Sequence, residues 1–327
     1  MATKTPQGAP AVRKFRPRTI VIAGVVVVML LGAGTWIWAS TSSSEAVAPA
    51  GVLHQDTRMG VVDLIVSDLP LMRDFYEDAV GLDVLTETED RVELGSNDSV
   101  LISLTRAAEL EVPDPTTAGL YHSAILYPDK ASLAAVLLSV VETAPQTYQG
   151  SADHSVSLAF YFADPEGNGV ELYVDTPEEE WEWNDGRVTM GAEPLDPNRF
   201  ISENLAQEGS GSATVGHMHL RVGNLDAAQE FYVDAIGFDI TAEAPGALFM
   251  SAGGYHHHLA VNTWSSQNAS QRIPALGLGH MTVLLADSAE LEAATARVAG
   301  VGLTVTTIDG GIAVDDPWGN TVHLRVA

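Results

Sequence analysis

Several histidines stand at matching places in the chain, and their chemistry suggests a metal centre. His122, His217 and His280 each lie in an alternating apolar run that predicts a first strand, while Glu171 and His323 each follow a similar turn into a last strand. Imidazole nitrogens and carboxylate oxygens are ligands that divalent iron, manganese and zinc accept. A single strand histidine is more often an ordinary polar residue, but repeated positions joined by a carboxylate favour metal ligation.

The composition narrows the chemistry further. The chain of 327 residues contains ten histidines, no cysteine and 43 acidic against 16 basic residues, which gives a formal net charge of −27. The absence of cysteine excludes disulfides, thiolate metal sites, iron–sulfur clusters and thiol nucleophiles. An acidic surface repels phosphate backbones, so we expect no nucleic-acid partner. The 46% of hydrophobic residues is enough for a folded core.

An internal repeat predicts the elements that position these residues. Residues 60–84 and 216–240 align without a gap, and each copy begins with a strand followed by an Asp or Asn that caps a short helix. A finer repeat inside each copy ends in an Asp-Pro-x-Gly-Asn turn that leads into a last strand. We therefore expect four strand–helix–strands modules, near 58–105, 118–175, 214–264 and 277–327.

The first 57 residues predict a membrane anchor and a linker. Residues 1–18 carry five basic and no acidic residues, which is typical of a cytoplasmic N-terminus. Residues 19–39 contain no charged residue, and as a helix they would extend about 30 Å, enough to cross a bilayer. Residues 40–57 read as a linker. We expect a single-pass membrane protein with an extracytoplasmic body; secretion after signal cleavage is the alternative.

Six short motifs stand out beyond residue 57. They are Gly119-Leu120-Tyr121-His122, Asp153-His154, Tyr161, residues 164–173, Gly216-His217-Met218-His219-Leu220 and residues 251–258. With these motifs the sequence resembles the vicinal oxygen chelate superfamily of glyoxalases, bleomycin-resistance proteins and extradiol dioxygenases, and within it the two-domain catechol 2,3-dioxygenase-like branch. The resemblance implies an α+β fold of four βαβββ modules in two tandem vicinal-oxygen-chelate domains, 58–175 and 214–327, joined by an acidic connector, 176–213.

In this fold the first and last strands of two paired modules project side chains into one concave sheet. Residues at matching strand positions can therefore bind the same metal. If modules two and three pair, His122, His217 and Glu171 form the two-histidine, one-carboxylate set expected of a non-haem Fe(II) oxygenase, which Mn(II) would also accept. If modules three and four pair instead, His217, His280 and His323 form an all-histidine set typical of zinc. We favour the first pairing because it alone contains a carboxylate and agrees with the resemblance.

The resemblance also implies residues that act around the metal. His257 matches the family's His-x-aliphatic-Ala pattern and is the candidate acid–base residue. Tyr161 has the family's spacing before the last-strand carboxylate and is the candidate for bonding the bound diol, while His154 and His258 are candidates for contacting substrate. Strand alternation alone would place His256 and His258 on one face and His257 on the other, so the histidine that faces the metal stays open.

Together these features predict a metal-dependent extradiol ring-cleaving dioxygenase. Its substrates would be a catechol-like aromatic diol and O2, and its cofactor Fe(II), with Mn(II) as the alternative. Two other functions fit the same fold: a small-molecule-binding module of the resistance type, and a glyoxalase-like lyase or isomerase. We expect contact with the membrane through the N-terminal helix and allow for a homo-oligomer.

Overall fold

The computed structural model describes residues 52–327 except 207–208 and 210. The predicted basic N-terminus (1–18), the predicted anchor (19–39) and most of the linker lie outside the described residues. Within the part of the chain that the structure describes, no helix is both long and apolar enough to span a bilayer.

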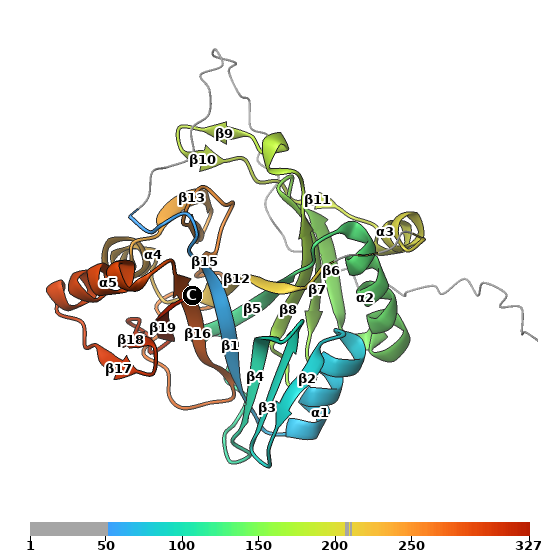
Figure 1. Cartoon of the computed structure of the whole chain (residues 1–327), viewed down its shortest axis with the longest axis horizontal. Coiled ribbons are helices and arrows are strands. Elements are labelled where there is room, and N and C mark those ends of the chain that lie inside the picture. Colours follow the sequence, from blue (N-terminus) through green and yellow to red (C-terminus); the bar gives the residue numbers. More distant parts are fainter. Residues whose placement is uncertain (1–51, 207–208, 210) are drawn as a thin grey trace, which may run out of the picture.

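Each of the four predicted modules folds as a strand, a helix and three further strands (Figure 1). Module one contains β1 (Arg58–Val66), α1 (Leu69–Asp74), β2 (Asp83–Glu87), β3 (Arg91–Ser96) and β4 (Ser99–Arg106). Module two contains β5 (Gly119–Leu126), α2 (Lys130–Thr143), β6 (Tyr148–Asp153), β7 (Ser157–Ala163) and β8 (Gly169–Asp175). Module three contains β12 (Thr214–Arg221), α4 (Leu225–Gln229), β13 (Asp239–Ala244), β14 (Ala247–Ser251) and β15 (Leu259–Asn262). Module four contains β16 (Gly277–Leu285), α5 (Ser288–Gly300), β17 (Thr306–Ile308), β18 (Gly311–Asp315) and β19 (Thr321–Val326).

The modules pair into two sheets. Modules one and four form the first sheet, in the order β17-β18-β19-β16-β1-β4-β3-β2. Modules two and three form the second sheet, to which the connector adds the edge strand β11 (Glu193–Pro194), in the order β11-β6-β7-β8-β5-β12-β15-β14-β13. At the centre of each sheet two first strands meet antiparallel, β1 with β16 and β5 with β12. The favoured pairing of modules two and three is confirmed, and the alternative pairing of three with four is wrong, because β12 lies between β5 and β15.

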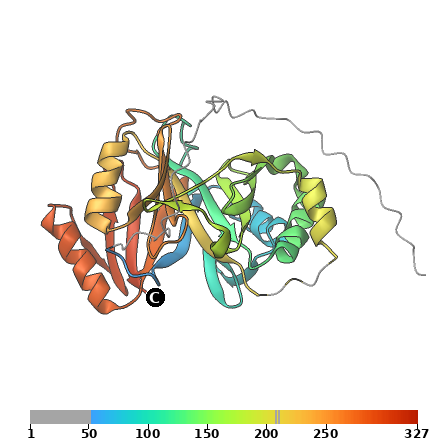
Figure 2. The ribbon, with the colours of Figure 1, turned by 90° about the horizontal axis from the view of Figure 1, so that it is seen from above.

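The helices begin where the sequence places a capping side chain. Asp68 accepts a hydrogen bond from the backbone N–H of Leu71 at the start of α1, and Asn224 caps α4 in the same way through Ala227. Both short helices continue as π-helical segments, Phe75–Ala79 and Glu230–Ile236. Figure 2 shows α1 beside α2 at one end of the molecule and α4 beside α5 at the other.

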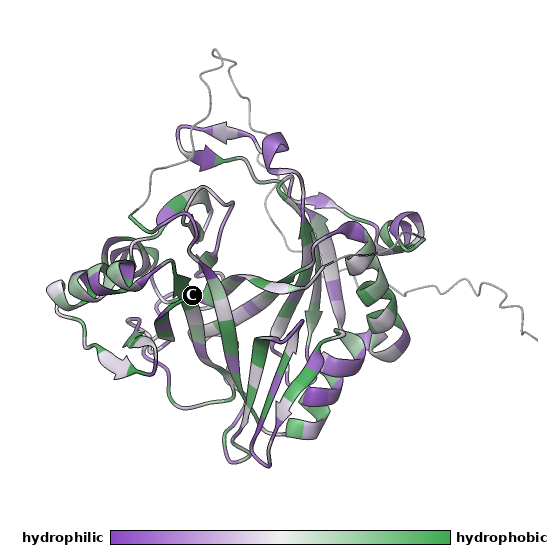
Figure 3. Ribbon diagram, in the orientation of Figure 1, coloured by the Kyte–Doolittle hydropathy of each residue, from purple (hydrophilic) through white to green (hydrophobic). Residues whose placement is uncertain are grey.

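The core lies between the helices and the sheets. Leucine, valine and isoleucine side chains that alternate along the strands are buried there, and Figure 3 shows apolar residues following the strands while hydrophilic residues gather on helix surfaces and loops. The opposite face of the second sheet carries polar and aromatic side chains instead. We call this second face the open face.

Two buried tyrosines connect the short helices of modules one and three to the Asp-Pro-x-Gly-Asn turns of modules two and four. Tyr76, in the π-helical segment after α1, donates a hydrogen bond to Asp164 in the turn before β8, at 3.2 Å. Tyr232, in the π-helical segment after α4, donates to Asp316 in the turn before β19, at 2.8 Å. Burial raises the pKa of Asp164 to about 6, although hydrogen bonds from Asn168 oppose the shift. These contacts fix the turns from which β8 and β19 begin.

The acidic connector folds against the second sheet. It contains a hairpin of β9 (Trp183–Asn184) and β10 (Arg187–Val188), the edge strand β11 (Glu193–Pro194) and α3 (Pro197–Asn204). Trp181 and Val188 pack with Val156 and Ala242 in a separate apolar cluster. The connector therefore closes one side of the open face.

Candidate metal centre

His122, Glu171 and His217 lie together on the open face of the second sheet. We call them the triad. Their strands are neighbours, because β5 carries His122 while β8 and β12 flank β5. Ala124 on β5 is paired with Glu171 on one side and with His217 on the other. Its single methyl group leaves room above β5 for the longer side chains to converge.

The triad has the geometry of a cation site. The Nε2 atoms of His122 and His217 lie 3.0 and 3.1 Å from the same oxygen, Glu171 Oε2. One ligand atom from each of the three residues lies within 4.8 Å of the other two. The residues are only 6%, 2% and 1% exposed, in chain order. Metal–ligand bonds of about 2.0–2.2 Å can therefore reach one common point with little rearrangement.

The electrostatics of the triad also fit a metal. Burial disfavours the ionised form of Glu171, but attraction to His217 and His122 outweighs it and holds the pKa of Glu171 well below its usual range. Burial lowers the pKa of His217, which favours the neutral form that binds metals. His217 Nδ1 has no hydrogen-bond partner among the described residues, and His122 Nε2 makes no well-aligned hydrogen bond although Glu171 Oε2 is 3.0 Å away. A buried carboxylate oxygen that two imidazole Nε2 atoms approach suits a divalent cation.

Tyr161 and His154 form a bonded pair beside the triad. Tyr161 on β7 is paired with Glu171 on β8, and its hydroxyl lies 2.7 Å from His154 Nε2. His154 Nδ1 lies 2.8 Å from the carbonyl oxygen of Gly191 in the connector. Because a carbonyl only accepts, Nδ1 carries the proton and Nε2 accepts from Tyr161. Burial raises the pKa of Tyr161 well above its usual range, so it remains a neutral hydroxyl.

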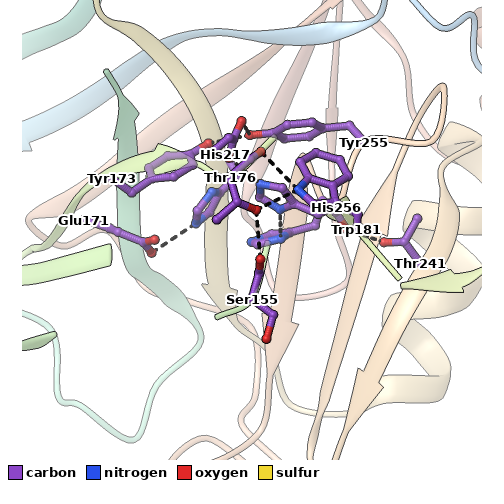
Figure 4. A network of polar contacts seen from close by, with 11 residues as sticks. Ser155, Glu171, Tyr173, Thr176, Trp181, His217, Thr241, Tyr255 and His256 are labelled. Carbon is purple, nitrogen blue, oxygen red and sulfur yellow. Dashed lines mark hydrogen bonds and ion pairs between the residues drawn. The ribbon is translucent and has the colours of Figure 1, made fainter. Parts of the chain in front are cut away.

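Three consecutive histidines, His256–His258, precede β15, and we call them the histidine run. The ring of His257 lies next to the triad. The ring centroids of His257 and His217 lie 4.1 Å apart. His257 Nδ1 is 2.8 Å from His256 Nδ1, and His256 Nε2 is 2.8 Å from Asp175 Oδ1. Figure 4 shows His256 within this network, where Tyr255 also donates to Asp175.

With one proton on each ring, these contacts fix the tautomers of His256 and His257. A carboxylate only accepts, so His256 donates from Nε2 to Asp175 and accepts at Nδ1 from His257. The lone pair of His257 is therefore on Nε2. Burial lowers the pKa of His257 well below its usual range, which keeps this ring neutral.

His258 takes a different direction from His257. Its Nδ1 atom lies 2.9 Å from Ser251 Oγ at the end of β14, and its ring packs against Tyr255 with centroids 4.9 Å apart. The structure therefore does not bring His258 to the triad. The run precedes β15, so strand alternation did not apply to it.

The sequence did not lead us to predict a group of packed aromatic rings next to the triad. The Tyr121 ring lies 5.2, 4.8 and 5.6 Å, between centroids, from His122, His219 and Trp264. Asn262 Nδ2 lies 2.9 Å from His219 Nε2 and holds that ring. His219 could have been predicted there, because it lies two residues after His217 and so on the same face of the strand. Trp264 follows β15, and no sequence pattern indicated its position.

His280 and His323 occupy the matching positions of the first sheet, away from His217. Their rings stack with centroids 3.8 Å apart and planes 22° apart, so their in-plane lone pairs run side by side instead of meeting at one point. Asp63 Oδ2 lies 3.8 Å from His280 Nδ1, and Val61 stands where the third ligand would be. The all-histidine alternative is not assembled.

Comparisons with known proteins show the family of the chain. The family model described as Glyoxalase/Bleomycin resistance protein/Dioxygenase superfamily matches residues 58–172 and 214–324. A catechol-2,3-dioxygenase of Bacillus subtilis (strain 168) is 34% identical over 274 residues, which cover 81% of this chain and 95% of that protein. Biphenyl-2,3-diol 1,2-dioxygenase 3 of Rhodococcus globerulus is 29% identical over 129 residues, 38% of this chain and 67% of that protein. The crystal structure of a proposed dioxygenase from Bacillus subtilis has a similar fold, with a TM-score of 0.57 at 13% identity, covering 82% of this chain and 84% of that one.

Proposed function

Because the chain belongs to the glyoxalase, bleomycin resistance protein and dioxygenase superfamily, we propose that it is an extradiol dioxygenase that opens the ring of a catechol-like diol beside the two hydroxyl groups. One observation carries the proposal: two imidazoles and one carboxylate converge in a buried site. Similarity to a catechol-2,3-dioxygenase along nearly the whole length of that protein supports the reaction class.

We propose Fe(II) as the metal. Two nitrogens and one oxygen leave coordination positions free, which is the donor set that non-haem Fe(II) oxygenases use; Mn(II) accepts the same set. Iron held by His122, Glu171 and His217 would supply the Lewis acidity that ionises the diol and the electrons that activate O2.

The surrounding residues then handle protons and exclude water. His257 presents the unprotonated Nε2 atom, which can take a proton from a diol hydroxyl and later return it. Asp175, acting through His256, holds that tautomer and stabilises the charge that His257 gains. Tyr161 places a neutral hydroxyl beside Glu171, where it can bond a substrate oxygen.

The experiment uses the purified full-length chain, solubilised in detergent and loaded with Fe(II) without air. We expect addition of a catechol and O2 to consume one O2 per diol and, with ¹⁸O2, to place both oxygen atoms in an open-chain product. His280→Ala should retain this activity, whereas Glu171→Gln should lose it. Diol binding without O2 uptake would instead support a resistance-type module, and turnover without O2 a glyoxalase-like enzyme.

We propose that the chain is a single-pass membrane protein with its body outside the cytoplasm. The support comes from the sequence of residues 1–39, in which a basic segment precedes an uncharged one. Fractionation of cells expressing the full chain should recover it in the membrane pellet, with the body open to protease added outside the cytoplasmic membrane. A shortened soluble product would favour signal cleavage.

A further inference from the structure

Arg221, the last residue of β12, is a half-buried cation that no acidic side chain in the described part of the chain neutralises. Its Nε atom is buried without a hydrogen-bond partner, and its guanidinium makes no hydrogen bond or ion pair with any described residue. The charges that reach it belong to Tyr121 and Arg272. In a chain with 43 acidic residues, the absence of a carboxylate at this point implies that the anion comes from elsewhere.

The residues around Arg221 increase its need for an anion. An uncompensated buried charge is costly, and a second cation close by adds repulsion. Arg272 is that second cation, but its guanidinium donates to Asn320 Oδ1 and to the carbonyl oxygen of Leu278, both at 2.9 Å. Arg221 has no such acceptor within residues 52–327 as far as the structure describes them. An incoming anion would therefore be bound mainly by Arg221.

Strand geometry places Arg221 on the same face as the triad. Along β12, His217, His219 and Arg221 alternate with Met218 and Leu220, whose side chains are fully buried on the helix side. At about 3.3 Å per residue, the Cα atom of Arg221 lies roughly 13 Å from that of His217.

No side chain from the neighbouring strand lies between Arg221 and Arg272. The β5 residue opposite Arg221 is Gly119, which has no side chain. The guanidinium of Arg272 lies over this glycine instead, 3.7 Å from the position that a Cβ atom would take, so both cations lie at this end of the sheet.

Tyr121 connects the triad to Arg221. The charges of both Glu171 and Arg221 act on the Tyr121 hydroxyl. The Tyr121 ring also contacts those of His122 and Trp264. An aromatic surface thus runs from the metal ligands toward the guanidinium, and a flat ring can lie along it.

We propose that Arg221 binds a carboxylate on the side chain of the substrate, so that the enzyme prefers catechols with a short acidic arm over neutral catechols. The inference rests on the proposed function, because the diol must be held at the triad for the arm to reach Arg221. A guanidinium pairs with a carboxylate through two parallel hydrogen bonds, and this pairing fixes the direction of the ring as well as its affinity.

The test compares 3,4-dihydroxyphenylacetate with its methyl ester, which shares the ring and arm but lacks the charge. We expect wild-type kcat/KM to be at least tenfold higher for the acid. Arg221→Gln should lower kcat/KM for the acid about 10- to 100-fold, mainly through KM, and change it less than about threefold for the ester. The matched control is Arg187→Gln, which removes an exposed arginine paired with Glu243 and should leave kcat/KM unchanged for both substrates.

Equal wild-type rates for acid and ester, or equal losses in Arg221→Gln, would overturn the inference while leaving the dioxygenase intact. If neither compound is cleaved, the proposed function fails, and equilibrium dialysis of the same pair decides about Arg221. Acid-selective binding that Arg221→Gln abolishes would support the anion site, and binding without selectivity for the acid would overturn it.

Discussion

Replacing Glu171 by glutamine tests the metal centre directly, because it keeps the shape of the side chain and removes only its charge. Oε2 of Glu171 lies 3.0 and 3.1 Å from the Nε2 atoms of His122 and His217, and the residue is 2% exposed. Removing one partner of a buried charge pair costs about 3–5 kcal/mol. At about 1.4 kcal/mol per factor of ten, the metal should bind about 10²- to 10⁴-fold more weakly.

The assay is an anaerobic titration with Mn(II), in which electron paramagnetic resonance measures the free ion. Wild type should bind one ion per chain at the triad. His280→Ala removes an imidazole from the matching place in the first sheet, so it should bind like wild type. Circular dichroism of each metal-free variant establishes that it is folded. An affinity of Glu171→Gln within about tenfold of wild type, or an equal loss in His280→Ala, would refute the assignment.

Three further predictions concern residues around the triad and below the sheet. Asp175→Asn removes the carboxylate that fixes the tautomer of His257 through His256, so kcat should fall about tenfold or more with little change in KM. An unchanged kcat in steady-state assays would contradict this role of Asp175. Tyr161→Phe removes the hydroxyl beside the carboxylate ligand, and we expect a loss of about 10- to 100-fold in kcat with metal content unchanged, measured by elemental analysis. Asp164 has a pKa of about 6 when folded against about 3.8 when unfolded, so its contribution to stability is present below about pH 4 and lost as pH rises through 6. The loss is up to about 3 kcal/mol, and denaturant unfolding at pH 4 and 7 should show it in wild type but not in Asp164→Asn.

The repeats sufficed to predict the four modules and the matching ligand positions, because alternation and turn chemistry are local signals. Module pairing is not local. The carboxylate-containing ligand set and the family resemblance led to modules two and three, and the β5–β12 ladder confirms that choice. The orientation of His257 could not be predicted from alternation, because the run lies before β15. Nor could the partner of His154, since Gly191 comes from a connector without regular periodicity.

One fold gives a cation site in the second sheet and none of the same form in the first, and the ligand positions explain the difference. His122 and Glu171 have the same strand register as His280 and His323, because β5 pairs with β8 as β16 pairs with β19.

Val61 stands at the position that corresponds to His217, so the first sheet lacks the third ligand that would draw two imidazoles apart around an ion. Without it, the two neutral rings of that sheet stack.

The complete site takes its carboxylate from the first half of the chain and His217 from the second. Each sheet likewise takes one module from each half. Metal binding is therefore a property of the paired halves, which the central β5–β12 ladder holds in register.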